Sequence, residues 1–478
     1  MNPRLSTLAR WSSSTAVLLL CLASGALCGA IAAPAGELAY FVGQLYLAVV
    51  NMAAVPLLVV ATFFGLRQVL DLPRPGLRIG TIVGLAAVLV VLCAAAATLT
   101  GVLAMPGHLS ADAHAHLGEL VLRSAGDAED MRVKLFDTSV PAAAPSDGYG
   151  LRDMFPDNFY RVLAQGRSLG ILTGTILFGM AFAALSREQS AMLGNVFEGI
   201  YRTFENIIAY ANLLIPVLAF GTAAFLVAHT QRATLDAMSG FLLCFLLLAL
   251  GFGCAALAAI AARAGQPFGR VLAELKAPLL VGLTSGSATA PIPHAIEAMS
   301  TKLGFSRGIV ELVVPFGSVF VRSGSALYFA LATVFVANLY ERPLGATDIA
   351  LIAAASAAAA LVSAGQSGVV TVGYTAIVLS LLQLPVEAAG VLFITIDLLC
   401  EGPRNVLSLL SVCVVIAWVS AGLPSERVAA VEPRGVSAGE WRPALQFAFS
   451  RAQLALAAGC VVLAATLIVL MGIGVGAK

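Results

Sequence analysis

The sequence is short of charge. Only 11% of its 478 residues are Asp, Glu, Lys or Arg, whereas soluble domains carry roughly 25%. Hydrophobic residues make up 59% of the chain, and the mean hydropathy is +0.94. The net charge of +1 provides no basic surface for a polyanion, so we exclude nucleic acid as a partner. This composition is typical of a polytopic membrane protein.

Residues that react or bind metals are also scarce. The eight cysteines lie within apolar stretches, without metal-ligand spacing, so we interpret them as small buried hydrophobic residues. Most of the five histidines lie in loops, and the pair His114 and His116 is more typical of a solvated segment than of a metal site. No nucleophile stands beside a suitable base. These absences argue against an enzyme, and we predict no cofactor and no metal site.

Apolar stretches long enough to cross a bilayer recur along the chain. Windows of about 20 apolar residues predict helices near 15–33, 40–66, 79–105, 169–185, 207–227 and 240–262. From Pro278 to Gln383 the apolar pattern is interrupted by Ser, Gly and Pro. Irregular backbone at membrane depth survives only inside protein or beside a polar cavity. Two such interruptions around a broken helix indicate the discontinuous segments of a secondary transporter.

These patterns together predict the fold class and the orientation. We expect an all-α polytopic membrane protein with about eight transmembrane helices, two re-entrant helical hairpins and one extra C-terminal transmembrane helix. The first apolar stretch is longer than the core of a signal peptide, so we interpret it as a retained helix. Short loops rich in Arg and Lys fall on one side of the membrane, which predicts a cytoplasmic N-terminus. We expect a location in a bacterial-type inner membrane, with the lipid bilayer as surroundings.

One apolar stretch near the C-terminus carries ionisable residues. At about 3.6 residues per turn, Asp397, Glu401 and Arg404 fall on one face of a helix. A charge at the bilayer centre costs roughly 2.5 to 3.5 kcal/mol on insertion scales, so such residues usually face a polar cavity. The guanidinium of Arg404 is suited to bidentate binding of a carboxylate. The alternative is an internal ion pair with Glu401, three residues earlier.

Several motifs occur in a recognisable order. They are 284–291, which is rich in Ser and Thr, Pro315-Phe-Gly, Gly324-Ser-Ala-Leu-Tyr328, and Ile396-Asp397 with Arg404. From the first helix to about Gly422 the chain resembles the dicarboxylate/amino acid:cation symporters, the family of glutamate and aspartate transporter homologues. The resemblance implies a homotrimer with an elevator mechanism, in which a rigid scaffold supports a mobile transport domain.

The resemblance also implies a division of the chain. The scaffold takes the first, second, fourth and fifth helices, and hairpins at 277–299 and 351–384 act as gates. The expected parts are 1–76 (scaffold helices 1 and 2), 77–105 (transport-domain helix 3), 106–157 (extracytoplasmic loop), 158–232 (scaffold helices 4 and 5), 233–422 (transport domain), 423–453 (cytoplasmic linker) and 454–478 (the extra helix).

By the same resemblance, Arg404 selects an acidic substrate. Glu401 stands where the family has an aspartate that holds the substrate amino group, and its alternative role is to accept a proton. We expect His294 and Glu297, in the second arm of the first hairpin, to lie at the surface. The remaining predicted substrate contacts, for which capping of broken backbone is the alternative role, are Asn405, Asp397, Ser285, Gly286, Ser287, Ser325, Gln366, Ser367, Thr371 and Ser408.

The chain departs from the family where sodium ions would bind. The family's Asn-Met-Asp segment reads Val321-Arg322-Ser323 here, and Ser408 and Val412 replace an Asn and an Asp. Cys93 and Ala94 replace a Thr and a Ser in the third helix. Sodium needs hard oxygen ligands, which a valine side chain cannot supply. We expect Arg322, with Ser323, to substitute for the cations by providing fixed positive charge.

The sequence therefore predicts a secondary active transporter for an acidic amino acid or a dicarboxylate. We expect it to be coupled to protons or uncoupled, with a small anion as substrate and no use of sodium. The alternatives are a sodium-coupled symporter that binds the ion through backbone carbonyls alone, and, from another class, a substrate-gated anion channel.

Overall fold

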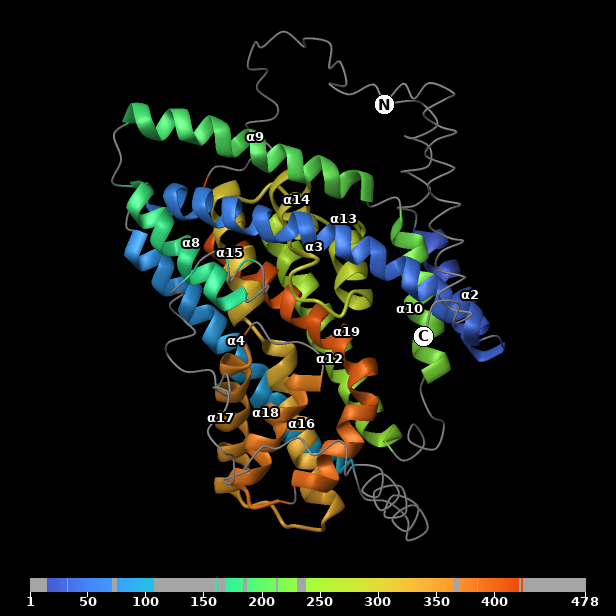
Figure 1. Cartoon of the computed structure of the whole chain (residues 1–478). Helices are drawn as coiled ribbons and strands as arrows, with labels where there is room; N and C mark the ends of the chain where they lie inside the picture. The colour runs from blue at the N-terminus through green and yellow to red at the C-terminus, as the bar shows by residue number, and fades with distance from the viewer. Residues whose placement is uncertain are drawn as a thin grey trace, which may run out of the picture. The chain divides into compact units, whose positions relative to one another are not determined.

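The computed structural model describes residues 15–31, 33–70, 75–106, 158, 160, 163, 168–183, 187–211, 214–229, 238–364, 369–384, 386–420 and 423. Every regular element among them is a helix (Figure 1). Most of the loop expected at 106–157, most of the linker expected at 423–453 and the whole of the last helix expected at 454–478 lie outside the described residues. Helix count and membrane orientation therefore stay predictions from the sequence.

The N-terminal helices pack against one another through small residues. Helix α2 (Thr15–Ile31) and helix α3 (Ala33–Leu70) both lie against α10 (Ile215–His229). A Cβ atom added at Gly25 or Gly29 would come within 2.3 or 2.2 Å of a backbone oxygen of α10. Glycines four residues apart allow two helix backbones to touch, which is a common way for helices to associate in a membrane. Helix α8 (Ser168–Ala183) also packs against α3.

Helix α9 (Arg187–Ala211) differs from the expectation. The sequence search found an apolar span at 207–227, but the structure divides this region between the end of α9 and α10. Charged residues recur between the apolar residues of α9. No stretch of about 20 residues within it is therefore apolar enough to be predicted as a membrane span. Its apolar residues recur at helical spacing instead, and the helix packs against α3.

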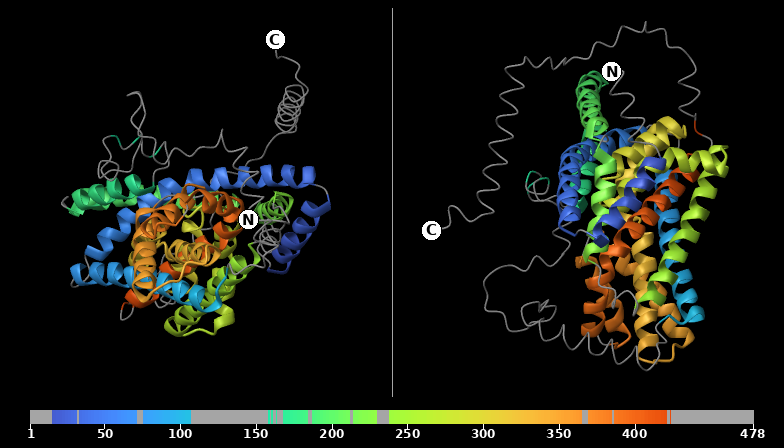
Figure 2. Two further views of the ribbon diagram at one scale, coloured as in Figure 1. Left: turned by 90° about the horizontal axis from the view of Figure 1, so that it is seen from below. Right: turned by 90° about the vertical axis from the view of Figure 1, so that its right-hand side faces the viewer.

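The helices after residue 74 build the larger part of the core. Helix α4 (Pro75–Ala104) packs against α16 (Ser323–Leu339) and α17 (Ala346–Val362), while α12 (Ser239–Ala264) packs along α19 (Val386–Val419) (Figure 2). Among the described residues, 5 helical stretches are long and apolar enough to cross a membrane: Leu38–Phe63, Pro75–Ala104, Ser239–Ala264, Arg307–Leu339 and Leu399–Val419. These stretches agree with an integral membrane protein of helical type.

Two pairs of helices lie where the apolar pattern is interrupted. Helix α13 (Phe268–Thr284) turns at residues 285–291 into α14 (Ile292–Glu297), and a π-helical turn, η2 (Ala298–Lys302), follows. Helices α17 and α18 (Val369–Leu381) form the second pair. In each pair the two helices contact each other, and one partner also contacts α19.

Between these pairs the chain forms a broken helix. Helix α15 (Arg307–Phe320) ends at Val321, and α16 begins at Ser323. Val321 and Arg322 leave helical geometry, with ψ angles of 74° and 48°. The most apolar window of this stretch is 94% buried, more than in any other candidate span described. The break therefore lies in the protein interior, where its backbone groups need partners other than water.

Candidate anion-binding site

The centre of the site is an ion pair within α19. Arg404 is 1% exposed, and its Nη1 atom donates a hydrogen bond of 2.8 Å to Oδ1 of Asp397, seven residues earlier. Two helical turns separate these residues by about 10 Å along the axis, which the long arginine side chain spans. Sequence reasoning placed both residues on one face and gave a pair with Glu401 as the alternative to a substrate role for Arg404; the ion pair in the structure is with Asp397 instead. The pair neutralises both charges and leaves Arg404 Nε without a hydrogen-bond partner among the described residues.

A tyrosine that the sequence analysis did not select as a site residue supports the guanidinium. The ring of Tyr328, in α16, lies 4.9 Å from the guanidinium carbon of Arg404. This cation–π contact is strong where water is excluded. Tyr328 makes edge-to-face contacts with Phe241, Phe245 and Phe393, from α12 and α19. A cluster of rings from three helices thus fixes the height and angle of Arg404. The spacing of Ser325 and Tyr328, one helical turn apart, is the signal that could have identified this tyrosine.

The broken helix crosses α19 at Arg404. A Cβ atom added at Gly324 would come within 2.0 Å of the carbonyl oxygen of Arg404, so only glycine allows this approach. The N–H group of Gly324 donates to Ser408 Oγ at 3.1 Å, and that hydroxyl donates to the carbonyl of Arg404 at 2.9 Å. Ser408 was predicted to contact the substrate. In this structure its hydroxyl instead provides a hydrogen-bond partner for the backbone at the break between α15 and α16.

The first turn, between α13 and α14, is closed by its own hydrogen bonds. Ser287 donates its N–H to Ser285 Oγ, and Ser287 Oγ accepts from the N–H groups of Thr289 and Ala290. Gly286 has a φ of 60°, which favours glycine. Its backbone lies directly over Glu401, because an added Cβ atom would meet Glu401 Oε2 at 3.3 Å. The structure thus brings the predicted residues of the first turn next to the charged face of α19.

Arg322 lies at the break between α15 and α16 and is 1% exposed. It is within electrostatic range of Arg404, Glu401 and Tyr374. Ser323 and Ser325, which follow it in the first turn of α16, are also buried. The site therefore holds two buried arginines and the buried Asp397, with the partly exposed Glu401 next to them.

Several buried polar atoms in this cluster have no hydrogen-bond partner among the described residues. They belong to residues in the first two turns of α16 and at the middle of α19: Arg404 Nε, Asn405 Nδ2, Ser323 Oγ, Ser325 Oγ and Tyr328 Oη. Burying such a group without a partner costs about 1 to 3 kcal/mol. Since a native structure rarely leaves many of them together, this set of donors indicates a place for a ligand with several acceptor oxygens.

Three predicted contacts of the expected second hairpin fall partly or wholly outside the description. Gln366 and Ser367 are outside the described residues, and Thr371 is described only as part of the backbone of α18. The expectation for His294 was wrong, because this side chain is 3% exposed within α14. Helix α14 packs against α15 and α3. These contacts between distant segments cannot be predicted from the polarity of the local sequence. Glu297, with 44% of its side chain exposed, pairs with Lys302.

Three of the positions expected to lack sodium ligands, Val412, Cys93 and Ala94, offer only carbon or sulfur in their side chains. Val412 is 0% exposed and lies against Gly317, whose added Cβ atom would meet Val412 Cγ2 at 2.6 Å. Cys93 and Ala94 are buried in α4. These residues do not fit a sodium ion, because they replace hard oxygen ligands with apolar or soft atoms.

Comparison with known protein families matches residues 15–421 to the sodium:dicarboxylate symporter family. The matched segment covers most of the chain, from α2 to the end of α19. The chain belongs to this family. It is therefore an integral membrane protein of a family of transporters, and the family is not one of enzymes.

Curated relatives carry names that agree with this assignment. A C4-dicarboxylate transport protein of Cupriavidus taiwanensis is 29% identical over 310 residues, which cover 63% of this chain and 70% of the relative. C4-dicarboxylate transport protein 1 of Bradyrhizobium sp. is 28% identical, over 59% and 64% of the two chains. The protein of the same name from Ralstonia nicotianae is 31% identical, over 56% and 63%. The aligned part thus spans about two thirds of each relative.

Proposed function

We propose that this protein is a secondary active transporter that carries a C4-dicarboxylate across a bacterial inner membrane without sodium. The observation that carries the proposal is the buried Arg404–Asp397 pair together with the neighbouring donors that lack partners. Relatives named as C4-dicarboxylate transport proteins support the substrate class. An acidic amino acid is the second candidate, since it shares the carboxylates and differs by one ammonium group.

In this proposal Arg404 binds one substrate carboxylate. Its Nη1 atom holds Asp397, and its Nε atom supplies a donor toward the substrate. Asn405 Nδ2 and Ser325 Oγ add donors at the same crossing. Asp397 acts by orienting the guanidinium rather than by touching the anion, because two carboxylates repel each other. We expect the first turn, at Ser285, Gly286 and Ser287, to cover the substrate together with Gln366, Ser367 and Thr371 of the expected second hairpin.

Glu401 is the proposed proton carrier. A C4-dicarboxylate has no ammonium group, so an ionised Glu401 would face only negative charge from the substrate. Repulsion between that carboxylate and the dianion would favour the neutral carboxylic acid. A proton on Glu401 would therefore enter with the dianion and leave with it. For an acidic amino acid the same carboxylate would stay ionised and hold the substrate ammonium group.

Arg322 is the proposed replacement for the coupling cations. In a carrier of dianions, positive charge near the site offsets the charge of the substrate. Arg322 provides that charge permanently, next to the positions where the family's sodium ligands are missing. Ser323 adds a hydroxyl at the start of α16. A carrier with this fixed charge needs no bound sodium to accept a dianion.

The proposed mechanism is an elevator motion within a homotrimer. The scaffold would comprise 1–76 and 158–232, and the transport domain would comprise 77–105 and 233–422. The pairs α13–α14 and α17–α18 would be the re-entrant hairpins that act as gates. Their contacts with α19 support this assignment, since each pair lies next to the charged helix.

Uptake of labelled succinate into liposomes that contain the purified protein tests the proposal. We expect saturable uptake in choline buffer, driven by an inward proton gradient, with less than a two-fold change when sodium replaces choline. Glu401→Gln should keep succinate exchange but lose proton-driven accumulation. Ser411→Ala, on the same helix, is the matched control, because among the described residues its hydroxyl bonds only to the carbonyl of Leu407.

Three results would contradict parts of this proposal. A stimulation by sodium of about tenfold or more would show a sodium-coupled symporter. Competition by aspartate but not by succinate or malate would show an amino acid carrier. A large ohmic current without substrate would show an anion channel, whereas slow and saturable counterflow is expected of a carrier.

A further inference from the structure

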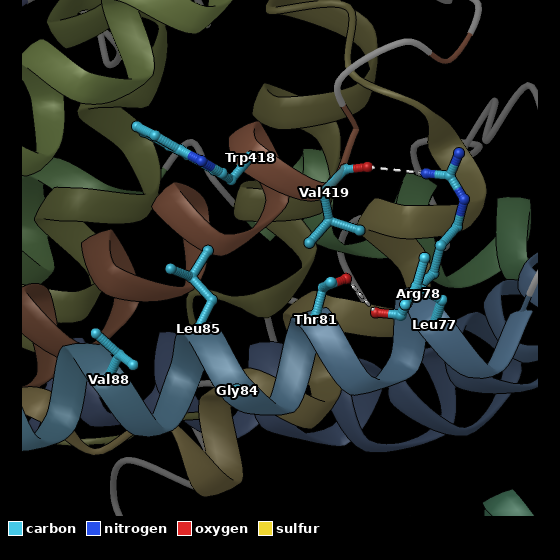
Figure 3. Close-up of a pocket in the computed structure, with 8 residues that line it drawn as sticks. All are labelled: Leu77, Arg78, Thr81, Gly84, Leu85, Val88, Trp418 and Val419. Carbon is cyan, nitrogen blue, oxygen red and sulfur yellow. Dashed lines mark hydrogen bonds between the residues drawn. The ribbon is translucent and has the colours of Figure 1, made fainter.

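A groove lies far along α19 from the charged cluster, at the end of the helix. It has a volume of about 780 Å³ and runs between the first turns of α4 and the last residues of α19 (Figure 3). Most of its wall is apolar. Its lining residues are Leu77, Arg78, Thr81, Gly84, Leu85, Val88, Trp418 and Val419.

Two arginines lie at this end of the molecule. Arg78, in the first turn of α4, donates one hydrogen bond of 3.1 Å to the carbonyl oxygen of Val419, as Figure 3 shows. This bond places its guanidinium at one end of the groove, with further N–H donors to offer. Arg263, in the last turn of α12, has its guanidinium carbon 4.2 Å from the ring centre of Trp418. The indole ring thus links the second arginine to the groove.

Neither arginine has a carboxylate partner in the described part of the chain. The ion pairs found there involve Arg202, Lys302, Arg307 and Arg404 as the cations. Two positive charges therefore stand at one end of an apolar groove. A ligand that fits must combine a negatively charged head with an apolar body.

We propose that this groove binds one anionic phospholipid of the surrounding bilayer. Val88, Leu85 and Gly84 receive an acyl chain, and Arg78 and Arg263 receive the headgroup phosphate. Basic pockets between the ends of transmembrane helices bind anionic headgroups in this way, and a half-exposed tryptophan is typical of the membrane–water interface. The orientation predicted from the Arg and Lys distribution assigns the groove to the cytoplasmic leaflet.

The groove would have a structural consequence for α19. Because Arg78 already donates a hydrogen bond to the carbonyl of Val419, the last residue of α19, a phosphate held by Arg78 and Arg263 would join the ends of α4, α12 and α19. The bound lipid would then stabilise the helix that carries Asp397 and Arg404. This inference is independent of the transported substrate and of the coupling ion.

Fluorescence of Trp418 tests the site directly. The chain has 3 tryptophans, so Trp11→Phe with Trp441→Phe leaves Trp418 as the reporter. The protein is placed in vesicles that mix phosphatidylcholine with brominated phosphatidylglycerol, and in matched vesicles where the phosphatidylcholine is brominated instead. Bromine quenches only nearby indoles, so the two curves give the relative binding constant of the two lipids at the groove.

We expect phosphatidylglycerol to bind at least about five-fold more tightly than phosphatidylcholine, the effect of one arginine near a headgroup. Arg78→Gln should reduce this preference, and Arg78→Gln with Arg263→Gln should bring it close to one. Arg78→Gln is the cleaner variant, since Arg78 does not contact the indole. Arg270→Gln, an exposed arginine outside the groove, is the matched control and should leave the preference unchanged.

Two outcomes would overturn the proposal. An equal affinity for both lipids in the parent protein would mean that Trp418 meets only the general annulus of lipid. Weak quenching by both brominated lipids would mean that another part of the chain, such as 424–478, fills the groove. Loss of succinate transport with the lipid preference intact would contradict the proposed function and leave this site standing.

Discussion

Helix α12 and the broken stretch α15–α16 are both apolar enough to cross a membrane, yet they lie in opposite surroundings. The most apolar window of α12 is 22% buried, whereas that of the broken stretch is 94% buried. Helix α12 exposes Leu243, Leu246, Leu247 and Leu250, which is expected where lipid is the solvent. The broken stretch buries Arg322, Ser323 and Ser325 beside α19. Hydropathy identifies both as spans, and buried polar groups distinguish the one that forms a site.

The first and largest expected effect concerns the buried charge. Arg404→Gln should reduce succinate uptake by at least about 100-fold, because removing one member of a buried, hydrogen-bonded ion pair costs several kcal/mol. Arg404→Lys should keep the charge and the fold but lose the planar guanidinium that can bind a carboxylate through two N–H groups. We expect a similar loss of uptake. Arg270→Gln, at an exposed arginine outside both sites, is the control. Wild-type uptake by either Arg404 variant would remove the basis for the site.

A second test compares two glycines. Gly324→Ala should destabilise the protein by about 3 kcal/mol or more, because the new Cβ atom would lie 2.0 Å from the carbonyl of Arg404. Gly251→Ala on α12 meets nothing within 4 Å, and it should be neutral or stabilising by up to about 1 kcal/mol. Thermal unfolding of the two variants in detergent measures both. Equal melting temperatures would mean that the crossing of α16 and α19 is looser than described.

A third test compares two leucines. Leu331, in α16, is 0% exposed, and Leu331→Ala should cost about 2 kcal/mol through lost packing. Leu250, in α12, is 65% exposed, and Leu250→Ala should change stability by less than about 0.5 kcal/mol, since lipid replaces the lost contacts. The same unfolding measurement applies. An equal loss at both positions would mean that α12 is covered by protein in the assembled state.

The smallest expected effect concerns a hydroxyl. Ser408→Ala removes the only partner that the described residues offer to the N–H of Gly324, and should cost about 1 to 2 kcal/mol. Ser411→Ala removes a hydrogen bond from the serine hydroxyl to the carbonyl four residues earlier. A helix does not need this bond, so the substitution should leave stability almost unchanged. A direct role of Ser408 in binding would instead appear as a higher KM with an unchanged melting temperature.

Much of the fold could be predicted from local pattern. The helices at 79–105 and 240–262 were expected within a few residues of α4 and α12, because a bilayer demands long apolar stretches. Helix α9 was missed because its charged residues interrupt every apolar window. The burial of His294 was also missed, since it depends on α15 and α3, which are distant in sequence.

The amino-acid sequence by itself determined that this is a helical membrane protein and that Asp397, Glu401 and Arg404 share one face of α19, because helical periodicity and the cost of buried charge are local properties. Only the tertiary structure decided that Arg404 pairs with Asp397, that Tyr328 lies beneath the guanidinium, and that Gly286 closes over Glu401. Those choices depend on where α16 and the first turn cross α19, and contacts between separate helices are set by the packing of the whole core.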